Sequence, residues 1–467
     1  MFSIPIFTVL GLNQVKKMPS LGVLNTQSAR PPAFVRQSAA AMRYWHLLCA
    51  LDWNAVPERC LDRNWGRAPV PYRAFIAACL VKLDQGLAHM SQLRQYLKDN
   101  PALAWLLGFN PVPDSSYFTG NRSQLALPTQ RHFARMLRLM PNAILQTLLD
   151  GSVVALRSEL ADANFGKVIS LDTKHILAWV RENNPKQYVQ DRFDKTKQPV
   201  GDPDCRLGCK KRHNRRVTPP PTPVGNPVPA GQVDIGEFYW GYASGVVVTK
   251  IAGQAEVVLA ELTQSFDHPD VSYFYPLMAE TERRLGFRPP FGALDAAFDA
   301  AYVYEYFAQT GGFAAVPLVD RGGYAKRQFN EDGLPLCQAG LPMPLLYTFV
   351  DRSHLFERPM GRYHCPLAGS QSTCPSQHKN WAKGGCVSTM AIGPGARQRY
   401  TLDRESLEYK QVYNQRTAVE RINSQAVELG IERPHLRNGQ AIANLNTLIY
   451  ILINLRTLHR IRQRKSL

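Results

Sequence analysis

The stretch KVISLDTKHILAWV, residues 167–180, predicts either the first strand of a sheet or a bent hairpin. Its first half is apolar and partly β-branched, which favours a strand, and the polar run TKH follows Asp172. A carboxylate at the end of an apolar strand is costly unless it forms an ion pair, accepts hydrogen bonds or binds a cation. Asp172 is therefore the first candidate site residue.

The segments that follow predict a mixed α/β sheet flanked by helices. Pro and Gly residues separate these segments, and their apolar residues follow the spacing of either strands or helices. Three strands and then alternating helices and strands produce such a sheet, because parallel strands need crossover connections. The predicted elements are strands at 241–250 and 256–263, a helix at 270–286, a short strand at 291–298, a helix at 299–309 and a strand at 314–320.

Regions of different composition flank and interrupt this predicted core, which spans 151–320. Residues 41–150 have apolar residues at three-to-four spacing and predict a compact helical domain of the DNA-binding type, after an N-terminal extension at 1–40. Residues 181–240 hold a basic run and then a Pro-rich stretch, which predicts an exposed loop insertion. The chain then continues through a Cys- and Gly-rich irregular insertion at 321–405 and ends in helices at 406–467.

The excess of basic residues indicates a polyanionic partner. The chain has 55 Lys and Arg residues against 37 Asp and Glu, a net charge of +18 and a pI near 9.6. Double-stranded DNA is such a partner, although a solvated basic surface or a contact with anionic lipids has the same balance. The run CRLGCKKRHNRR, residues 205–216, is either a DNA-backbone contact or a solvated loop. Its candidate DNA-binding residues are Lys210, Lys211, Arg212, Arg215 and Arg216.

Cysteine usage and hydropathy favour a cytoplasmic protein without a membrane span. Nine cysteines are an odd number and are not dense in 467 residues, so we expect reduced thiols. No run of about 18 apolar residues occurs. Two groups of cysteines have spacings compatible with a structural zinc site, but free thiols are favoured because neither group has an evident full ligand set. These groups are Cys205, Cys209 and His213, and Cys365, Cys374 and Cys386 with His364 and His378.

A second carboxylate ends another predicted strand. Asp295 follows the apolar run FGAL, as Asp172 follows VISL. If these two strands lie side by side, both carboxylates point to one place at the strand ends. Two like charges at that separation need a counter-charge, and a divalent metal is the usual one. We therefore expect these residues to bind Mg²⁺, with Mn²⁺ as an alternative.

A third carboxylate comes from the predicted helix YNQRTAVERINSQ, residues 413–425. Tyr413, Arg416 and Glu420 fall on one face of that helix, opposite its apolar side. Glu420 is then either a third metal ligand or half of a surface pair with Arg416 worth a few tenths of a kcal/mol. Three carboxylates around Mg²⁺ suit phosphoryl transfer. Lys174, Tyr413 and Arg416 are candidates to hold the phosphate oxygens of DNA.

Together these pieces resemble a DDE-type transposase of a bacterial insertion sequence, a family whose catalytic domain is RNase H-like. The resemblance rests on SLDT around Asp172, on ALDAAFD around Asp295 and on the helix pattern Y-x2-R-x3-E that ends at Glu420. The stretch PDSSYFTGNRSQL, residues 113–125, is similar to part of the helical N-terminal domain of these transposases. The resemblance covers about residues 40–460.

The resemblance implies roles for matching residues. Asp172, Asp295 and Glu420 would be the catalytic metal ligands, and Tyr413 and Arg416 would contact substrate DNA. Such a protein binds the terminal inverted repeats of its element, cleaves a strand to free a 3′-OH and joins that end to target DNA. A homodimer in the synaptic complex and a location at the prokaryotic nucleoid are also implied.

The chain departs from the family pattern at three positions. Val427 stands where the family helix often has Lys or Arg, and Ala297 and Phe298 stand where Gly and Tyr are usual. Two alternatives therefore remain beside an active cut-and-paste transposase. One is a catalytically inactive or domesticated DNA-binding protein from a transposable element, and the other is an RNase H-like nuclease.

Overall fold

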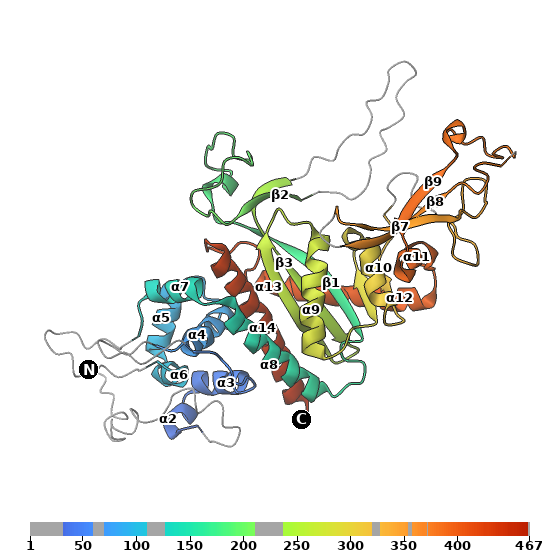
Figure 1. The fold of residues 1–467 in the computed structure, drawn as a ribbon. Coiled ribbons are helices and arrows are strands. Elements are labelled where there is room, and N and C mark those ends of the chain that lie inside the picture. The colour runs from blue at the N-terminus through green and yellow to red at the C-terminus, as the bar shows by residue number, and fades with distance from the viewer. Residues whose placement is uncertain are drawn as a thin grey trace, which may run out of the picture.

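The computed structural model describes residues 31–58, 70–109, 127–210, 237–319, 327–353, 357–370 and 372–465. A six-stranded mixed sheet lies at the centre of the molecule and helices cover both of its faces (Figure 1). The N-terminal helices lie on one side of this sheet, and a separate three-stranded sheet lies on the opposite side (Figure 1).

The central sheet combines antiparallel and parallel pairing. β1 (Val168–Leu177) pairs antiparallel with β3 (Glu237–Ile251), which pairs antiparallel with β4 (Ala255–Ser265). On its other side β1 pairs in parallel with β5 (Phe291–Leu294), and β5 pairs in parallel with β6 (Phe313–Ala315). The order β4-β3-β1-β5-β6 confirms the predicted RNase H-like mixed sheet, and residues 167–180 form a strand, not a hairpin.

Crossover helices connect the parallel strands, as predicted. A 3₁₀ turn η2 (Asp270–Tyr273) and helix α9 (Phe274–Leu285) lead from β4 to β5. A second 3₁₀ turn, η3 (Ala296–Phe298), and α10 (Ala301–Ala308) lead from β5 to β6. Helix α9 ends at Gly286, whose φ of 75° is the left-handed conformation that glycine adopts without strain.

The two faces of the sheet pack into two cores. Val246 and Val248 on β3 pack with the N-terminal helices and the C-terminal helices. Val247 lies between them in the sequence and packs on the opposite face, against α9 residues such as Leu277. Successive side chains of a strand point to opposite faces, so an all-apolar strand such as β3 is buried on both sides.

The N-terminal helices share their core with the sheet and do not form an independent hydrophobic unit. Helix α8 continues past residue 150, the predicted end of the helical region, and packs along the C-terminal helix. The helices of this part are α2 (Ala33–Arg36), α3 (Ala39–Leu48), α4 (Tyr72–Asp84), α5 (Met90–Asp99), α6 (Pro101–Leu106), α7 (Gln130–Leu139) and α8 (Asn142–Leu160).

The long C-terminal helix α14 (Gly439–Lys465) joins these parts. It packs against α4, α7, α8 and β4. By length and composition it would also cross a membrane, but 83% of its most apolar window is buried inside the protein, which is typical of a core helix. Asn454 on α14 donates to the carbonyl of Val258 and to Ser152 Oγ, at 2.9 Å each, and accepts from the Val258 N–H at 2.9 Å. Asn454 thus supplies hydrogen-bond partners for both the N–H and the carbonyl of Val258 in strand β4.

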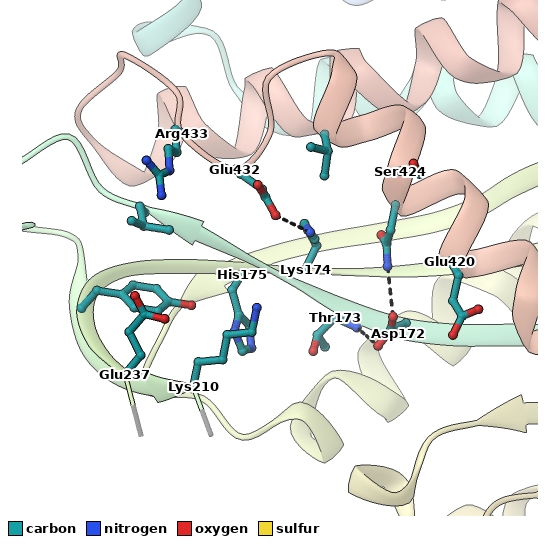
Figure 2. A pocket seen from close by; sticks show the side chains of 14 residues that line it. Asp172, Thr173, Lys174, His175, Lys210, Glu237, Glu420, Ser424, Glu432 and Arg433 are labelled. Atoms are coloured by element: carbon teal, nitrogen blue, oxygen red, sulfur yellow. Dashed lines mark hydrogen bonds and ion pairs between the residues drawn. The ribbon is translucent and has the colours of Figure 1, made fainter. Parts of the chain in front are cut away.

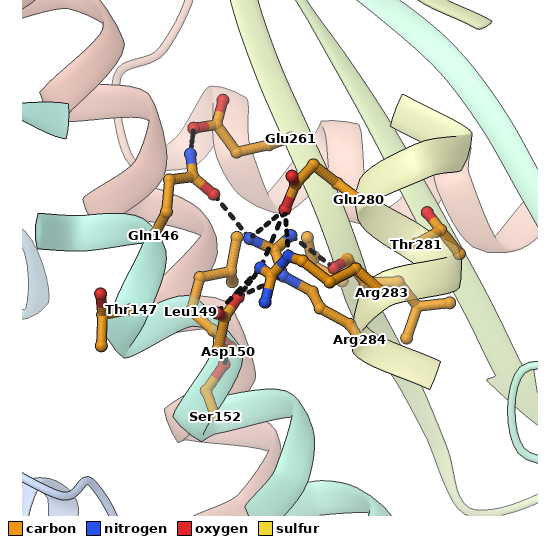
Figure 3. A network of polar contacts seen from close by, with 12 residues as sticks. Gln146, Thr147, Leu149, Asp150, Ser152, Glu261, Glu280, Thr281, Arg283 and Arg284 are labelled. Carbon is orange, nitrogen blue, oxygen red and sulfur yellow. Dashed lines mark hydrogen bonds and ion pairs between the residues drawn. The ribbon is translucent and has the colours of Figure 1, made fainter. Parts of the chain in front are cut away.

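A buried polar network connects α8, α9 and β4 (Figure 3). The side chain of Arg284 is 1% exposed and donates to Asp150 at 2.5 Å, to the carbonyl of Leu259 and to Gln146 at 2.7 Å. Gln146 in turn donates to Glu261 at 2.8 Å. Each nitrogen of the Arg284 guanidinium therefore donates to an acceptor, as a buried guanidinium requires.

Two predicted irregular regions contain regular structure. Within 321–405 the structure has a three-stranded antiparallel sheet and a helix, which corrects the prediction of an irregular insertion. Little in the sequence indicates this sheet, because its hydrophobic core has only a few buried residues, Met343, Tyr363 and Met390. The elements are β7 (Leu345–Asp351), β8 (Arg358–His364), η4 (Trp381–Lys383), β9 (Val387–Ala391) and α11 (Pro394–Thr401).

The basic and Pro-rich region 181–240 also differs from the predicted loop. It holds a 3₁₀ turn, η1 (Arg181–Asn183), and β2 (Arg206–Lys210), which pairs antiparallel with the start of β3. Strand β3 itself begins at Glu237, so the sheet reaches into the predicted insertion. The Pro-rich stretch 217–229 lies outside the described residues, as do 113–125.

The predicted helix 413–425 is divided in the structure. Helix α12 (Leu407–Tyr413) is followed by the 3₁₀ turn η5 (Asn414–Arg416) and by α13 (Thr417–Glu428). Ala418, Val419, Ile422 and Ala426 are fully buried, as their spacing predicted. Tyr413 packs against a small core with Tyr409, whereas Arg416 and Glu420 pair with each other, so the three polar residues do not act as one surface group.

Candidate active site

Asp172 and Asp295 lie next to each other where the parallel pairing of β1 with β5 ends. Leu171 and Leu294 are the last residues that pair these two strands, Asp172 is the next residue of β1, and Asp295 follows the end of β5. Asp172 was predicted to end its strand, but β1 continues to Leu177 because it stays paired with β3. Asp172 accepts from the Thr173 N–H at 2.9 Å, and Asp295 accepts from the Ala297 N–H at 2.9 Å. The predicted convergence of these two carboxylates is thus present in the structure.

Burial and the charge of neighbouring carboxylates make both aspartates hard to ionise. The pKa of Asp172 is raised to about 6, chiefly by burial and next by the charge of Asp295. Burial also raises the pKa of Asp295. The guanidinium of Arg416 lowers both pKa values but does not cancel the effect of burial. An added cation between these strands would therefore relieve an unfavourable charge arrangement.

Asp270 is a further carboxylate at this place that the sequence analysis missed. It lies in η2 and accepts a hydrogen bond of 2.7 Å from the hydroxyl of Thr173, the residue after Asp172. Its charge raises the pKa of both Asp172 and Asp295. The sequence assigned Asp270 to the start of a helix, where an acidic residue is ordinary. The sequence did contain one indication of a site role, because Asp270 comes shortly after the strand β4, as Asp295 comes after β5.

Glu420 lies on the same cavity as Asp172 but is engaged by an arginine. The cavity has a volume of about 650 Å³, and Figure 2 shows Glu420 on its helix beside Asp172 on β1. Glu420 Oε1 accepts from Arg416 Nη1 at 2.6 Å, the i,i+4 pair that was the alternative to metal binding. Within the part of the chain that the structure describes, no group of three or more His, Cys, Asp or Glu residues is arranged to hold a metal ion.

Helix α13 and the turn η5 before it are each held against β1 by a side-chain hydrogen bond. Asn423 Nδ2 of α13 donates to Asp172 Oδ2 at 3.0 Å, and Ser170 Oγ of β1 donates to the carbonyl of Gln415 in η5 at 2.9 Å. Asn423 was not among the predicted site residues, although its position three residues after Glu420 places it on a neighbouring part of the helix surface. These contacts fix the helix that carries Glu420 relative to the strand that carries Asp172.

The helical region before this site has a counterpart among known proteins. Residues 39–124 match the family model described as a transposase domain (DUF772). This match supports a transposase of a mobile element. It covers α3 to α6 and ends before the first carboxylate of the site, so it does not reach Asp172, Asp295 or Glu420. No curated protein matches the chain.

The predicted DNA-binding residues have different positions relative to this cavity. Lys174 lines the cavity and forms an ion pair of 2.5 Å with Glu432. Lys210 is exposed at the end of β2 and lines the same cavity. Tyr413 does not line it and stacks instead on Tyr409, with ring centroids 5.8 Å apart, in a small core beside β5 and β6. Lys211, Arg212, Arg215 and Arg216 lie outside the described residues.

Val427 also lines this cavity, on the same helix as Glu420. Its side chain is 37% exposed and apolar, at the position where the helix of the DDE-type transposases that the chain resembles often has Lys or Arg. The cations that border the cavity are Lys174, His175 when protonated, Lys210 and Arg433. Burial lowers the pKa of His175, so its ring is neutral near neutral pH.

The cysteines considered for zinc form two separate groups. Cys205 is buried and its thiol donates to the carbonyl of Asp202 at 3.2 Å, whereas Cys209 is exposed on β2 and His213 is outside the described residues. Cys365 directly follows His364 on β8 and Cys386 directly precedes Val387 on β9, and His364 and Val387 are the last register pair of these antiparallel strands. Burial, with the nearby thiols of Cys365 and Cys337, raises the pKa of Cys386 to about 12. Free thiols account for these observations, and zinc binding stays a prediction.

Proposed function

We propose that this chain is a DDE-type transposase that binds the terminal inverted repeats of its own element and moves it by cut-and-paste transposition. One observation carries the proposal: Asp172 and Asp295 lie side by side where the pairing of two adjacent parallel strands of an RNase H-like sheet ends, and Glu420 borders the same cavity as Asp172. The transposase-domain match at residues 39–124 supports the proposal independently, because it concerns a different part of the chain.

The donor atoms at this site suit a hard divalent cation. Asp172, Asp295 and Glu420 offer carboxylate oxygens, the ligands that Mg²⁺ and Mn²⁺ prefer. The raised pKa values of the two aspartates are the physical reason to expect a cation there, since a nearby positive charge stabilises their ionised forms. When bound, such an ion makes an attacking oxygen more nucleophilic and stabilises the leaving oxygen of a phosphodiester.

The reaction we propose has two phosphoryl-transfer steps. In the first, a water oxygen forms a bond to phosphorus at the end of the element, the bond from phosphorus to the 3′ oxygen breaks, and that oxygen leaves as a hydroxyl. In the second, this 3′-OH attacks a phosphodiester of target DNA and displaces its 3′ oxygen. Neither step needs a covalent bond between the protein and DNA.

The protein's own residues position these groups. Asn423 orients Asp172 by its hydrogen bond, and Lys174 and Lys210 are placed to neutralise phosphate oxygens along the cavity. Arg416 pairs with Glu420 in the free protein, and we propose that it turns to a DNA phosphate when Glu420 is recruited to the cation. We further propose that two copies pair the two ends of the element, and that the protein acts at the bacterial nucleoid.

Cleavage of DNA that carries the element's ends tests the proposal. The substrate is a labelled fragment of the DNA flanking the gene, incubated with Mg²⁺, with Mn²⁺ or with EDTA. We expect nicks at the element's ends that require the metal, and none with Asp172→Asn or Asp295→Asn. Glu428→Gln, on the exposed side of α13, serves as the matched control and should cleave normally.

The same assay separates the two alternatives. Specific binding without cleavage by the wild-type protein would indicate an inactive or domesticated DNA-binding protein. Metal-dependent cleavage without preference for the element's ends would indicate an RNase H-like nuclease. Unimpaired cleavage by Asp295→Asn would contradict the assigned site.

A further inference from the structure

A second cavity continues from the candidate active site and has a different chemical character. It has a volume of about 460 Å³ and shares Leu177 and Arg433 with the first cavity. Figure 2 shows Arg433 at the opposite end of the first cavity from Asp172 and Glu420. The two cavities therefore form one continuous track along β1 and the segment that connects α13 with α14.

The lining of the second cavity is cationic and contains no carboxylate. Three arginines, Arg181, Arg433 and Arg437, line it together with His435 and neutral polar and apolar residues. Arg433 forms no ion pair with any residue that the structure describes. The first cavity, in contrast, has four carboxylates among its lining residues, Asp172, Glu237, Glu420 and Glu432. The second cavity is thus suited to an anion and not to a metal.

An exposed indole forms one wall of this cavity. Trp179 is 51% exposed, which is unusual for the largest apolar side chain. The guanidinium of Arg437 lies over its ring at 4.9 Å from the centroid, and the ring of His435 lies 5.5 Å from it at a tilt of 32°. A planar aromatic surface beside cations is the arrangement that binds unpaired nucleobases, because every base has a π-face to stack.

The backbone around Trp179 is fixed although its side chain is exposed. The N–H of Leu177 donates to the carbonyl of Glu432 at 2.8 Å, which ties the α13–α14 connection to the end of β1. Asn183 donates to the carbonyls of Ala178 and Trp240, at 2.8 and 2.7 Å. The backbone that carries the indole is therefore held before any ligand binds, and the indole itself contacts Arg437 and His435, so stacking on it loses less conformational entropy than stacking on a side chain of a free loop.

We propose that this second cavity binds an unpaired nucleotide of the DNA strand that enters the active site, with its base on Trp179 and its phosphate near Arg433 and Arg437. The inference rests on the proposed function, since it concerns the DNA of that reaction. Leu177 follows Asp172 by five residues of β1, roughly 17 Å at 3.3 Å per residue. That length corresponds to about five base steps of B-DNA, so a short oligonucleotide spans both cavities.

Binding measurements without metal test this inference apart from catalysis. The probes are a fluorescent 12-nucleotide oligo(dT) and a hairpin duplex of equal strand length, titrated with the full chain at one salt concentration. We expect Trp179→Ala to weaken binding of the single strand by about 10-fold or more and binding of the duplex much less. Trp179→Phe should retain most of the affinity because it retains a ring.

Two further variants complete the experiment. Arg437→Gln removes the cation on the indole and should also weaken binding of the single strand selectively. Tyr188→Ala is the matched control, because Tyr188 is 92% exposed in the same segment and lies outside the cavity. Thermal melting of each variant checks that it is folded.

The outcomes distinguish this inference from the proposed function. Equal loss of affinity for both probes in the folded Trp179→Ala variant, or no loss, would overturn the inference and leave metal-dependent cleavage untouched. Selective loss for the single strand in a protein that never cleaves would support the nucleotide site and refute the transposition reaction. Loss of the same size in Tyr188→Ala would also overturn the inference.

Discussion

Asn423 on α13 donates a hydrogen bond of 3.0 Å to Asp172 on β1, and so connects the helix of Glu420 to the strand of the first aspartate. Hydrogen bonds from neighbouring residues orient metal-binding carboxylates, and their loss typically reduces activity or metal affinity by about 10- to 100-fold. We predict that Asn423→Ala reduces the rate of end cleavage by that factor. The affinity for DNA should be nearly unchanged, because Asn423 is buried and presents little surface to it.

Single-turnover cleavage at increasing Mg²⁺ concentration checks the prediction for Asn423. A positioning role predicts a higher Mg²⁺ requirement as well as a lower rate, which a mere loss of stability would not produce. Glu428→Gln on the same helix is the control. An Asn423→Ala variant with a normal rate and normal Mg²⁺ requirement would show that the hydrogen bond has no part in the reaction.

Asp172→Asn should stabilise the metal-free protein while abolishing its activity. The pKa of Asp172 in the folded protein is about 6, above its ordinary value of 3.8. The stability associated with this group is therefore fully present below pH about 4 and is lost as the pH rises through about 6. Asparagine avoids the buried charge, so we expect a gain of about 1–3 kcal/mol at pH 8 and none at pH 4. Cleavage should fall by a factor on the order of 10³ or more.

Thermal melting in EDTA at the two pH values measures the effect of Asp172→Asn. The melting temperature should rise only at pH 8, and Mg²⁺ should then stabilise the wild-type protein but not the variant. A variant that melts lower than the wild type at pH 8 would contradict the assignment of this carboxylate as a strained, cation-binding group.

Asp270→Asn should shift the pH dependence of cleavage toward acid. The Asp270 charge raises the pKa of Asp172 and of Asp295, so its removal lowers the pH at which both ionise. The ascending limb of the pH–rate profile should therefore move to lower pH. Asn keeps an oxygen to accept the hydrogen bond from Thr173, so local structure should persist. Asp267→Asn is the control, because Asp267 is half-exposed and is not among the main charges that raise the pKa of either aspartate. A shift of the same size in Asp267→Asn would show that the effect comes from the loss of any negative charge in this region and not from Asp270 in particular.

Glu261→Gln should remove a pH-dependent loss of stability in the core. Glu261 is buried in the network of Figure 3, and burial raises its pKa to about 7 although Thr447 and Gln146 donate hydrogen bonds to it. Because this pKa lies above the unfolded value of 4.5, the associated stability is fully present below pH about 4.5 and is lost as the pH rises through about 7. Gln remains neutral, so we expect a gain of up to about 3 kcal/mol at pH 8.

Urea unfolding at pH 4.5 and pH 8 measures this difference for Glu261. The midpoint of the variant should exceed that of the wild type at pH 8 and match it at pH 4.5. Glu405→Gln, at a side chain that is 88% exposed, should change neither midpoint. A lower midpoint for Glu261→Gln at pH 8 would indicate that Glu261 acts as a charged partner of Arg284.

Several features of this fold followed from local sequence pattern. Apolar runs such as VISL and FGAL predicted buried strands, and the order of strands and helices predicted a mixed sheet, since crossover connections limit how such elements pair. The apolar spacing of Ala418, Val419, Ile422 and Ala426 predicted their burial. These inferences depend only on side-chain periodicity and on chain connectivity, which are written in the sequence.

Other features depended on partners far away in the chain. Strand β2 forms in a basic run only because the start of β3 offers a pairing edge. The sheet β7-β8-β9 forms in a region of Gly, Pro and Cys because hydrogen-bond pairing supplies order that composition does not indicate. The 3₁₀ turn at Asn414–Arg416 interrupts a helix whose residues include no Pro or Gly. Tertiary packing overrides local propensity in each case.

The sequence by itself determined which residues are candidates for the chemistry, and that Asp172 and Asp295 each follow a short apolar run. Only the tertiary structure decided that Asp270 joins them, that Asn423 holds Asp172, and that Glu420 is paired with Arg416 in the free protein. It also decided that Tyr413 packs away from the cavity while Trp179 borders a second one. The reason is physical: the type of a side chain is local, whereas its charge state and its partners depend on burial and on groups brought near by the fold.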